Sequence, residues 1–224
     1  MGTGSDTGRL IAPDGKLSVL GFLAAGALGA VLALAISGWW WVLSAPCLVL
    51  GLFLLWFFRD PARNPPGGAD SVVSPADGRV LQVETEVEDS RFFEGRGTRI
   101  CIFMSPVDVH VNRNPVDGEV EAVRYHAGKY FAAYSDKASL DNEQNAVIMK
   151  ASDGRRVGYV QIAGFLARRI VCDLSEGDMC VRGQRMGMIK LGSRVDIFVP
   201  GSFKLGVETG DRVLAGETVL GRME

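Results

Sequence analysis

The pair Gly192-Ser193 near the end of the chain combines two residues that together could break their own peptide bond. Glycine reaches backbone conformations that are closed to other residues, so it can present a strained peptide bond to a neighbouring hydroxyl. Ser193 supplies such a hydroxyl. A tight bend between two strands would use the same two residues for a purely structural reason. The pair predicts a self-cleavage site if the chain also supplies the groups that activate the serine.

His110 is the candidate for the activating base. A serine hydroxyl is a weak nucleophile until a base removes its proton, and a carboxylate commonly fixes the tautomer of that base. Imidazole accepts a proton readily near neutral pH, and the chain has two His in all. Asp108 precedes His110 by two residues, so on a strand the two side chains would share a face, although an aspartate after Ser105-Pro106 also suits a turn. The second histidine, His126, lies where we expect a solvated surface turn.

Several motifs that lie far apart in the chain occur in one characteristic order. The main ones are Ser74-Pro75-Ala76-Asp77-Gly78, Ser105-Pro106-Val107-Asp108-Val109-His110-Val111-Asn112-Arg113 and Leu191-Gly192-Ser193. Others are Phe57-Phe58-Arg59-Asp60-Pro61-Ala62-Arg63, Asp136-Lys137-Ala138-Ser139, Asn142-Glu143-Gln144-Asn145 and Gln161-Ile162-Ala163-Gly164. With these motifs the chain, from about Phe57 to its C-terminus, resembles the phosphatidylserine decarboxylase proenzymes in their short bacterial and archaeal form.

The resemblance implies a catalytic set of Ser193, His110 and Asp77, in which Asp77 of the Pro-Ala-Asp-Gly motif orients His110. Asp108 remains the rival for that role. The resemblance also implies that the chain cleaves itself between Gly192 and Ser193 into a β chain of residues 1–192 and an α chain of residues 193–224. Longer members of the family carry a second histidine three positions after the first, where this chain has Arg113. Either His110 then performs both proton transfers, or His126 helps.

The cofactor that the resemblance implies is a covalent pyruvoyl group (pyruvate) generated from Ser193, with no metal and no separately bound cofactor. Its ketone would condense with the amine of phosphatidylserine and accept the electrons that are freed when the carboxylate leaves as CO2, as pyridoxal phosphate does elsewhere. The product would be phosphatidylethanolamine. The implied partners are phosphatidylserine, the lipid bilayer, and the chain's own α and β fragments as a heterodimer, which could assemble further.

Charge is distributed unevenly along the chain. No Asp, Glu, Lys, Arg or His occurs in residues 17–58, a stretch with room for two membrane-crossing helices of roughly 20 residues each. We expect these at Leu17–Ile36 and Trp39–Phe58, with residues 1–16 as an N-terminal tail. A hairpin that dips into one leaflet is the alternative. Basic residues flank both ends of the hairpin, which places the rest of the chain on the cytoplasmic side of the cell membrane.

Residues 59–224 have the composition of one soluble domain, which would carry the decarboxylase activity. Short apolar runs bounded by Gly, Pro and Asp predict strands, among them Arg79–Val83, Arg99–Phe103 and Asp196–Val199. We therefore expect a mainly β (α+β) domain with a barrel-sandwich-like element. The segment Ala132–Gln144 could form a short helix or an ordered loop. The formal net charge of -2 gives no sign of nucleic-acid binding, and the four Cys show no metal-ligand spacing.

A membrane-anchored carrier or adaptor protein is the alternative function. The segment Gly210-Asp211-Arg212-Val213-Leu214-Ala215-Gly216 is typical of a hairpin in biotinyl and lipoyl carrier domains, and residues 74–80 resemble the opening strand of that flattened barrel. Lys137 would be the modified residue. Its surroundings lack the alternating apolar hairpin that displays a modifiable lysine, which favours the enzyme. The cations Arg168, Arg169, Lys129 and Lys137 could attract lipid phosphate or simply face the solvent.

Overall fold

The computed structural model describes residues 8–92, 95–128, 142–164, 169–190 and 192–224. The described chain divides into two compact units, residues 8–61 and residues 62–224. Most of the segment Ala132–Gln144, for which a helix or a loop was expected, lies outside the described residues. So do Lys129, Lys137, Arg168 and Leu191.

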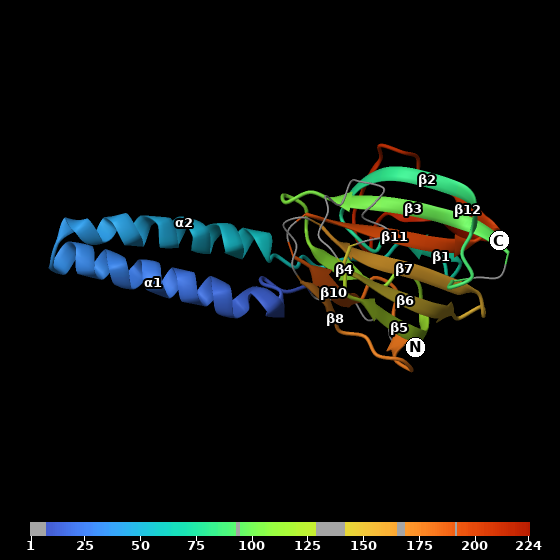
Figure 1. Ribbon diagram of the computed structural model, residues 1–224, viewed down its shortest axis with the longest axis horizontal. Helices are drawn as coiled ribbons and strands as arrows, with labels where there is room; N and C mark the ends of the chain where they lie inside the picture. The colour runs from blue at the N-terminus through green and yellow to red at the C-terminus, as the bar shows by residue number, and fades with distance from the viewer. Residues whose placement is uncertain (1–7, 93–94, 129–141, 165–168, 191) are drawn as a thin grey trace. The chain divides into compact units, whose positions relative to one another are not determined.

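The first unit is a helical hairpin (Figure 1). A short 3-10 turn, η1 (Pro13–Gly15), leads into α1 (Lys16–Ala35), and a second one, η2 (Gly38–Trp40), leads into α2 (Trp41–Phe57). Both helices are long and apolar enough to cross a membrane. The two expected apolar helices are thus present, with Ser37-Gly38 at the turn.

Small residues let the two helices of the hairpin approach closely. A Cβ atom added to Gly29 would lie 2.9 Å from the Cβ of Ser44, and one added to Gly26 would lie 3.0 Å from the backbone nitrogen of Leu48. The hydroxyl of Ser44 donates a hydrogen bond to the main-chain oxygen of Gly26 at 2.7 Å. Such small contact residues and interhelical hydrogen bonds are typical of helices that pack within a membrane.

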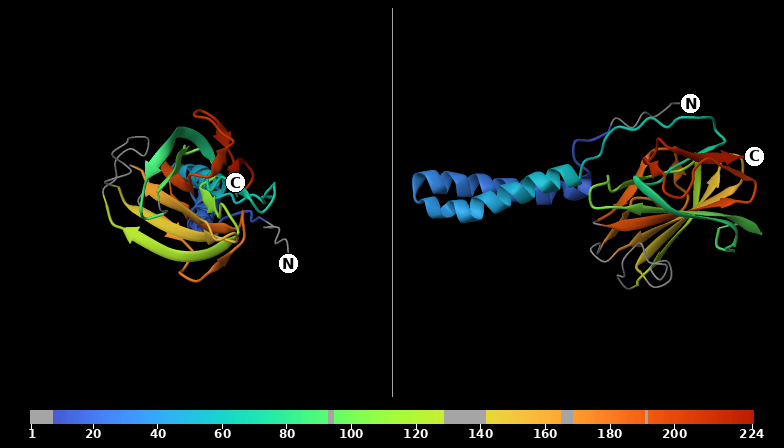
Figure 2. Two further views of the ribbon diagram at one scale, coloured as in Figure 1. Left: turned by 90° about the vertical axis from the view of Figure 1, so that its right-hand side faces the viewer. Right: turned by 90° about the horizontal axis from the view of Figure 1, so that it is seen from above.

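The second unit is built from strands. Their bounds are β1 (Ser71–Val73), β2 (Gly78–Glu88), β3 (Arg96–Met104), β4 (Val111–Arg113), β5 (Gly118–His126), β6 (Gln144–Ala151), β7 (Arg156–Ala163), β8 (Ile170–Cys172), β9 (Met179–Cys180), β10 (Arg185–Ile189), β11 (Ser193–Pro200), β12 (Phe203–Leu205), β13 (Arg212–Val213) and β14 (Val219–Met223). Eight of them form one sheet in the order β13-β2-β3-β11-β7-β6-β5-β9. This sheet is strongly curled (Figure 2). The expectation of a mainly β domain is confirmed, and the expected strands Arg79–Val83, Arg99–Phe103 and Asp196–Val199 lie within β2, β3 and β11.

Side chains alternate between the two faces of the large sheet, as the period of a strand requires. On β11, Val195, Ile197 and Val199 belong to the main hydrophobic core, whereas Phe198 belongs to a smaller cluster on the other face, where it stacks on Phe92. β11 lies in the middle of the sheet, and its first residue is Ser193. The core face of the sheet is therefore the face that Ser193 shares.

Two three-stranded sheets complete the unit, in the orders β1-β14-β12 and β4-β10-β8. The segments that resemble a carrier domain meet in space, because β13 pairs with the start of β2 and the N–H of Gly216 donates to the main-chain oxygen of Ser74. They form part of the domain's own fold. In the sheet β4-β10-β8, His110 immediately precedes β4.

Candidate active site

Ser193 lies at the centre of the large sheet, at one end of its strands. It pairs with Met104 of β3 on one side and with Ala163 of β7 on the other. Its side chain is fully buried, and its hydroxyl donates to the sulfur of Met104 at 3.3 Å. A thioether is a weak acceptor, so this contact leaves the hydroxyl weakly bound and able to turn.

Gly192 precedes β11 with a φ of +62°, in the left-handed region that only glycine enters at little cost. A Cβ atom at this position would meet nothing within 4 Å. The backbone conformation, and not crowding, is therefore the reason for a glycine here. The peptide bond between Gly192 and Ser193 joins this left-handed residue to a central strand.

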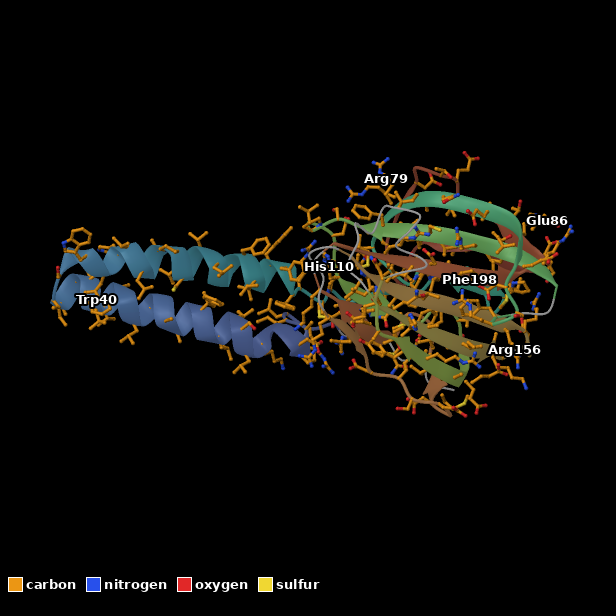
Figure 3. All side chains as sticks on the ribbon, viewed as in Figure 1. Trp40, Arg79, Glu86, His110, Arg156 and Phe198 are labelled. Carbon is orange, nitrogen blue, oxygen red and sulfur yellow. The ribbon has the colours of Figure 1, made fainter. Side chains whose placement is uncertain are left out.

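His110 contacts this peptide segment directly. Its Nε2 accepts a hydrogen bond from the N–H of Gly192 at 3.3 Å, and its Nδ1 lies 2.9 Å from the main-chain oxygen of Asp108. A carbonyl can only accept, so Nδ1 carries the proton, and Nε2 is the unprotonated, accepting nitrogen of the neutral ring. The ring is fully buried. Figure 3 shows His110 at one end of the β domain, with Glu86 and Arg156 at the opposite end.

Asp77 lies in a different contact network from His110. Both of its carboxylate oxygens accept hydrogen bonds from Arg63, at 2.8 and 3.1 Å, and Oδ1 also accepts from the N–H of Ala215 at 2.7 Å. Arg63 also binds Glu217 at 2.8 Å. Among the described residues, the hydrogen bonds of the Asp77 carboxylate do not include His110. Burial raises the pKa of Asp77, and the nearby Arg63 opposes this rise.

The carboxylate of Asp108 is also engaged elsewhere. It accepts from the N–H and the hydroxyl of Ser105, at 2.8 and 2.6 Å, and forms an ion pair with Arg212 at 2.7 Å. This arrangement is the turn that was the alternative interpretation of an aspartate after Ser105-Pro106. The contact of Asp108 with the imidazole comes from its main chain. Neither of the two candidate carboxylates thus contacts His110 among the described residues.

The buried side-chain amides of Asn145, Gln161 and Asn112 form a chain of hydrogen bonds that ends at Met104, the residue that the Ser193 hydroxyl contacts. Asn145 donates to Gln161 at 3.1 Å, Gln161 donates to Asn112 at 3.0 Å, and Asn112 donates to the sulfur of Met104 at 3.6 Å. Asn112, Asn145 and Gln161 belong to sequence motifs quoted above, but nothing in their spacing indicated that they meet. Their contacts depend on strand register, which sequence motifs alone do not reveal.

His126 and Arg113, the two remaining residues considered in the sequence analysis, make their contacts away from Ser193. His126 is exposed, as expected, but it is the last residue of β5 and pairs with Gln144, so the expected turn is a strand end. Alternation along β5 places its side chain on the opposite face from Tyr125 and Ser193. Arg113 is almost fully buried and donates to the main-chain oxygen of Gly183 at 2.9 Å.

A hollow of about 670 Å³ is lined by charged side chains of β5, β7 and the β2–β3 connection, including Arg91, Glu121 and Arg156. This part of the molecule is far from His110 (Figure 3). Within the described ranges there is also no cluster of three or more His, Cys, Asp or Glu that could hold a metal ion.

Comparison with known proteins gives one consistent result. A family model described as phosphatidylserine decarboxylase matches residues 50–221. Three relatives, each called a phosphatidylserine decarboxylase proenzyme, come from Ralstonia pickettii, Nitratidesulfovibrio vulgaris and Oleidesulfovibrio alaskensis. They are 46%, 47% and 48% identical to this chain, over 87%, 86% and 80% of its length and 87%, 88% and 82% of their own.

Proposed function

Because the chain belongs to the phosphatidylserine decarboxylase family of carboxy-lyases, we propose that it decarboxylates its lipid with a pyruvoyl group made from its own Ser193. The reaction converts phosphatidylserine to phosphatidylethanolamine and CO2. The family membership supports the decarboxylation itself. The self-cleavage and the prosthetic group rest on the geometry around Gly192 and Ser193.

The observation that carries this proposal is the contact of His110 with the peptide segment that would be cleaved. Nε2 of His110 lies 3.3 Å from the nitrogen of Gly192, and the hydroxyl of Ser193 belongs to the next residue. In the proposed cleavage, Oγ of Ser193 turns from Met104 and attacks the carbonyl carbon of Gly192, and Nε2 takes the hydroxyl proton. The C–N bond breaks as the ester forms, and the proton passes to the nitrogen of residue 193.

In the proposed sequence, β-elimination releases the carboxylate of Gly192 and leaves dehydroalanine at position 193, and water then hydrolyses its imine tautomer to ammonia and a pyruvoyl group. Position 193 suits that group. Its neighbours across the sheet, Met104 and Ala163, are uncharged, and the position is fully buried. A pyruvoyl group supplies a ketone that acts as an electron sink when CO2 leaves. Once cleavage is complete, Nε2 of His110 is the group that can hold a proton for the product carbon.

We assign Asp77 a positioning role in this scheme. Its carboxylate joins Arg63 to the main chain at Ala215, so it fixes the region around β13 and β14. The tautomer of His110 is held by the main-chain oxygen of Asp108. Asp77 therefore acts on the site through the fold and not by direct contact with the imidazole.

The helical hairpin would hold the enzyme at the membrane, where the diacyl substrate resides. Tethering at the interface raises the local concentration of substrate near the site. The basic flanks of the hairpin support a cytoplasmic position for the β domain. The α and β fragments would stay together as a heterodimer.

The experiment that tests the proposal is intact-mass spectrometry of the purified protein under denaturing conditions. We expect a 1–192 fragment and a 193–224 fragment that is lighter by one ammonia than a peptide beginning with serine. The Ser193→Ala variant should give one uncleaved chain. A single intact chain from active wild-type protein would contradict the pyruvoyl mechanism.

A further inference from the structure

Glu143 lies near Ser193, two strands away in the large sheet. Ser193 pairs with Ala163, and the N–H of Ala163 donates to the main-chain oxygen of Glu143 at 3.0 Å. Neighbouring strands are about 4.8 Å apart, so the two Cα atoms are separated by about 10 Å. A small ligand group between them can therefore contact both side chains at once.

The carboxylate of Glu143 is also on the same face of the sheet as Ser193. Its Oε1 accepts a hydrogen bond from the hydroxyl of Tyr125 at 3.0 Å. Tyr125 pairs with Asn145, Asn145 pairs with Gln161, and Gln161 pairs with Val195, so these residues share one face. Val195 follows Ser193 by two residues and faces the same way.

The second oxygen of this carboxylate, Oε2, is buried without a hydrogen-bond partner. The residue as a whole is 6% exposed. Among the described residues, no Lys, Arg or His forms an ion pair with Glu143. An unpaired buried carboxylate is costly in free energy, and a cation that donates hydrogen bonds is its natural complement.

We propose that Glu143 is the subsite for the primary ammonium group of the substrate. This inference rests on the proposed function, because phosphatidylserine brings that ammonium to position 193. Oε2 accepts a hydrogen bond from the ammonium and can take one of its protons. The nitrogen then becomes a neutral amine with a free electron pair, the form that can attack a ketone, and the proton resides on Oε2.

A Glu143 that is protonated in the resting protein would also explain a buried oxygen without a cation. The substitution Glu143→Gln separates the two explanations. It keeps the size of the side chain and an oxygen that can accept from Tyr125, and it removes the charge. A protonated Glu143 resembles glutamine, so the variant would then bind the substrate as the wild type does.

The test uses cleaved protein that has been treated with borohydride, which reduces the ketone to an unreactive alcohol. Binding of dihexanoyl phosphatidylserine and of its N-acetyl derivative is then measured by titration calorimetry. We expect the wild type to prefer the free amine by about tenfold or more, the range of hydrogen bonds to charged groups. Glu143→Gln should lose this preference and bind the N-acetyl derivative as the wild type does.

Glu121→Gln is the matched control. Glu121 forms an ion pair with Arg156 in the part of the sheet far from His110, so its variant should keep the full preference. Hydroxylamine provides a second measurement on protein that has not been reduced. It is already neutral at pH 7, so Glu143→Gln should form the hydroxylamine adduct at the wild-type rate while its decarboxylation falls.

Each outcome decides between the explanations. A Glu143→Gln protein that keeps the preference for the free amine overturns the inference, and so does one that loses both self-cleavage and hydroxylamine reactivity. If Glu143→Gln does not fold, Glu143→Asp keeps the charge on a shorter side chain and should show a reduced but measurable preference. An unchanged preference in that variant would also overturn the inference. A wild-type protein that never cleaves, or that borohydride leaves unchanged, refutes the proposed function instead.

Discussion

The imidazole of His110 is held between two main-chain groups, the oxygen of Asp108 and the N–H of Gly192. Asp108→Asn keeps this oxygen, so self-cleavage should stay within about threefold of the wild-type rate, whereas a triad carboxylate would cost about 10⁴-fold. His110→Ala should slow cleavage by at least about 100-fold, because no other described base contacts Gly192. Gel electrophoresis over time after synthesis measures both rates.

The circular dichroism spectrum of each variant serves as the control for folding. If Asp108→Asn slowed cleavage as much as His110→Ala while its fold stayed intact, the carboxylate of Asp108 would be the orienting group. In that case its hydrogen bonds with Ser105 and Arg212 would have to rearrange before cleavage.

The buried thiols make a second prediction at the scale of single residues. Burial and the nearby Asp196 raise the pKa of Cys101 to about 12, and burial raises the pKa of Cys180 to about 11. The thiolate is the reactive form of cysteine. At pH 8 both thiols should therefore resist iodoacetamide in the folded protein and react after denaturation, as peptide mass mapping would show.

The raised pKa of Cys101 makes the free energy of unfolding depend on pH in the alkaline range. An unfolded cysteine has a pKa near 8.5, so the folded state holds the Cys101 proton more tightly than the unfolded state does. The stability that results is fully present below about pH 8.5 and is lost as the pH rises towards 12. Urea unfolding at pH 8 and pH 10 should show a larger loss for the wild type than for Cys101→Ala. Equal losses would show that the thiol titrates normally.

At the scale of elements, the strands could be predicted from the sequence, but their register could not. The run Arg99–Phe103 was predicted as a strand because it is short and apolar, and it lies in β3 as expected. The pairing of Ser193 with Met104 and Ala163 depends on contacts between distant segments, which local propensity does not encode. For the same reason, the position of Glu143 could not be derived from its motif.

Asp77 illustrates the same limit for a single side chain. Its motif singled it out, but its partner Arg63 stood out only as the last residue of the motif Phe57–Arg63, with no sign that the two side chains meet. In the structure Arg63 is buried and joins Asp77 to Glu217. Burial of an arginine beside two carboxylates is a consequence of tertiary packing, and no local sequence pattern predicts it.

The hairpin makes a prediction of its own. Gly29→Leu should destabilise it by about 1–3 kcal/mol, because even a Cβ atom there lies 2.9 Å from the Cβ of Ser44. Gly21→Leu is the control, since a Cβ atom at that position meets nothing within 4 Å. The four Trp of the chain all lie in this hairpin, so tryptophan fluorescence during unfolding in detergent reports on it alone. Equal stability of the two variants would mean that the helices do not pack through Gly29.

At the scale of the whole molecule, the apolar helices and the proposed catalytic residues belong to different units. Residues 8–61 supply two helices that are apolar enough to cross a bilayer, and residues 62–224 contain Ser193, His110 and Glu143. Arg63 and its partner Asp77 both belong to the second unit. The proposed chemistry therefore draws on residues of one compact unit.

Cleavage before Ser193 would cut the chain at the first residue of β11 and leave β11 to β14 on the small fragment. β11 lies between β3 and β7, paired along its whole length with β3 and from Ser193 to Phe198 with β7. β13 pairs with β2, and β14 pairs with β1. The cut removes one covalent bond at the edge of this network and none of these hydrogen-bonded pairs.

The two fragments should therefore remain one folded particle. In size-exclusion chromatography without denaturant, the cleaved protein and the uncleaved Ser193→Ala variant should elute at the same volume. The 193–224 fragment should separate only at urea concentrations that unfold the sheet, since its core residues Val195, Ile197 and Val199 would have to enter water. Release of the fragment in native buffer would mean that β11 leaves the sheet after cleavage. The group at position 193 would then lose Met104 and Ala163 as its neighbours, and a site built on their register could not persist.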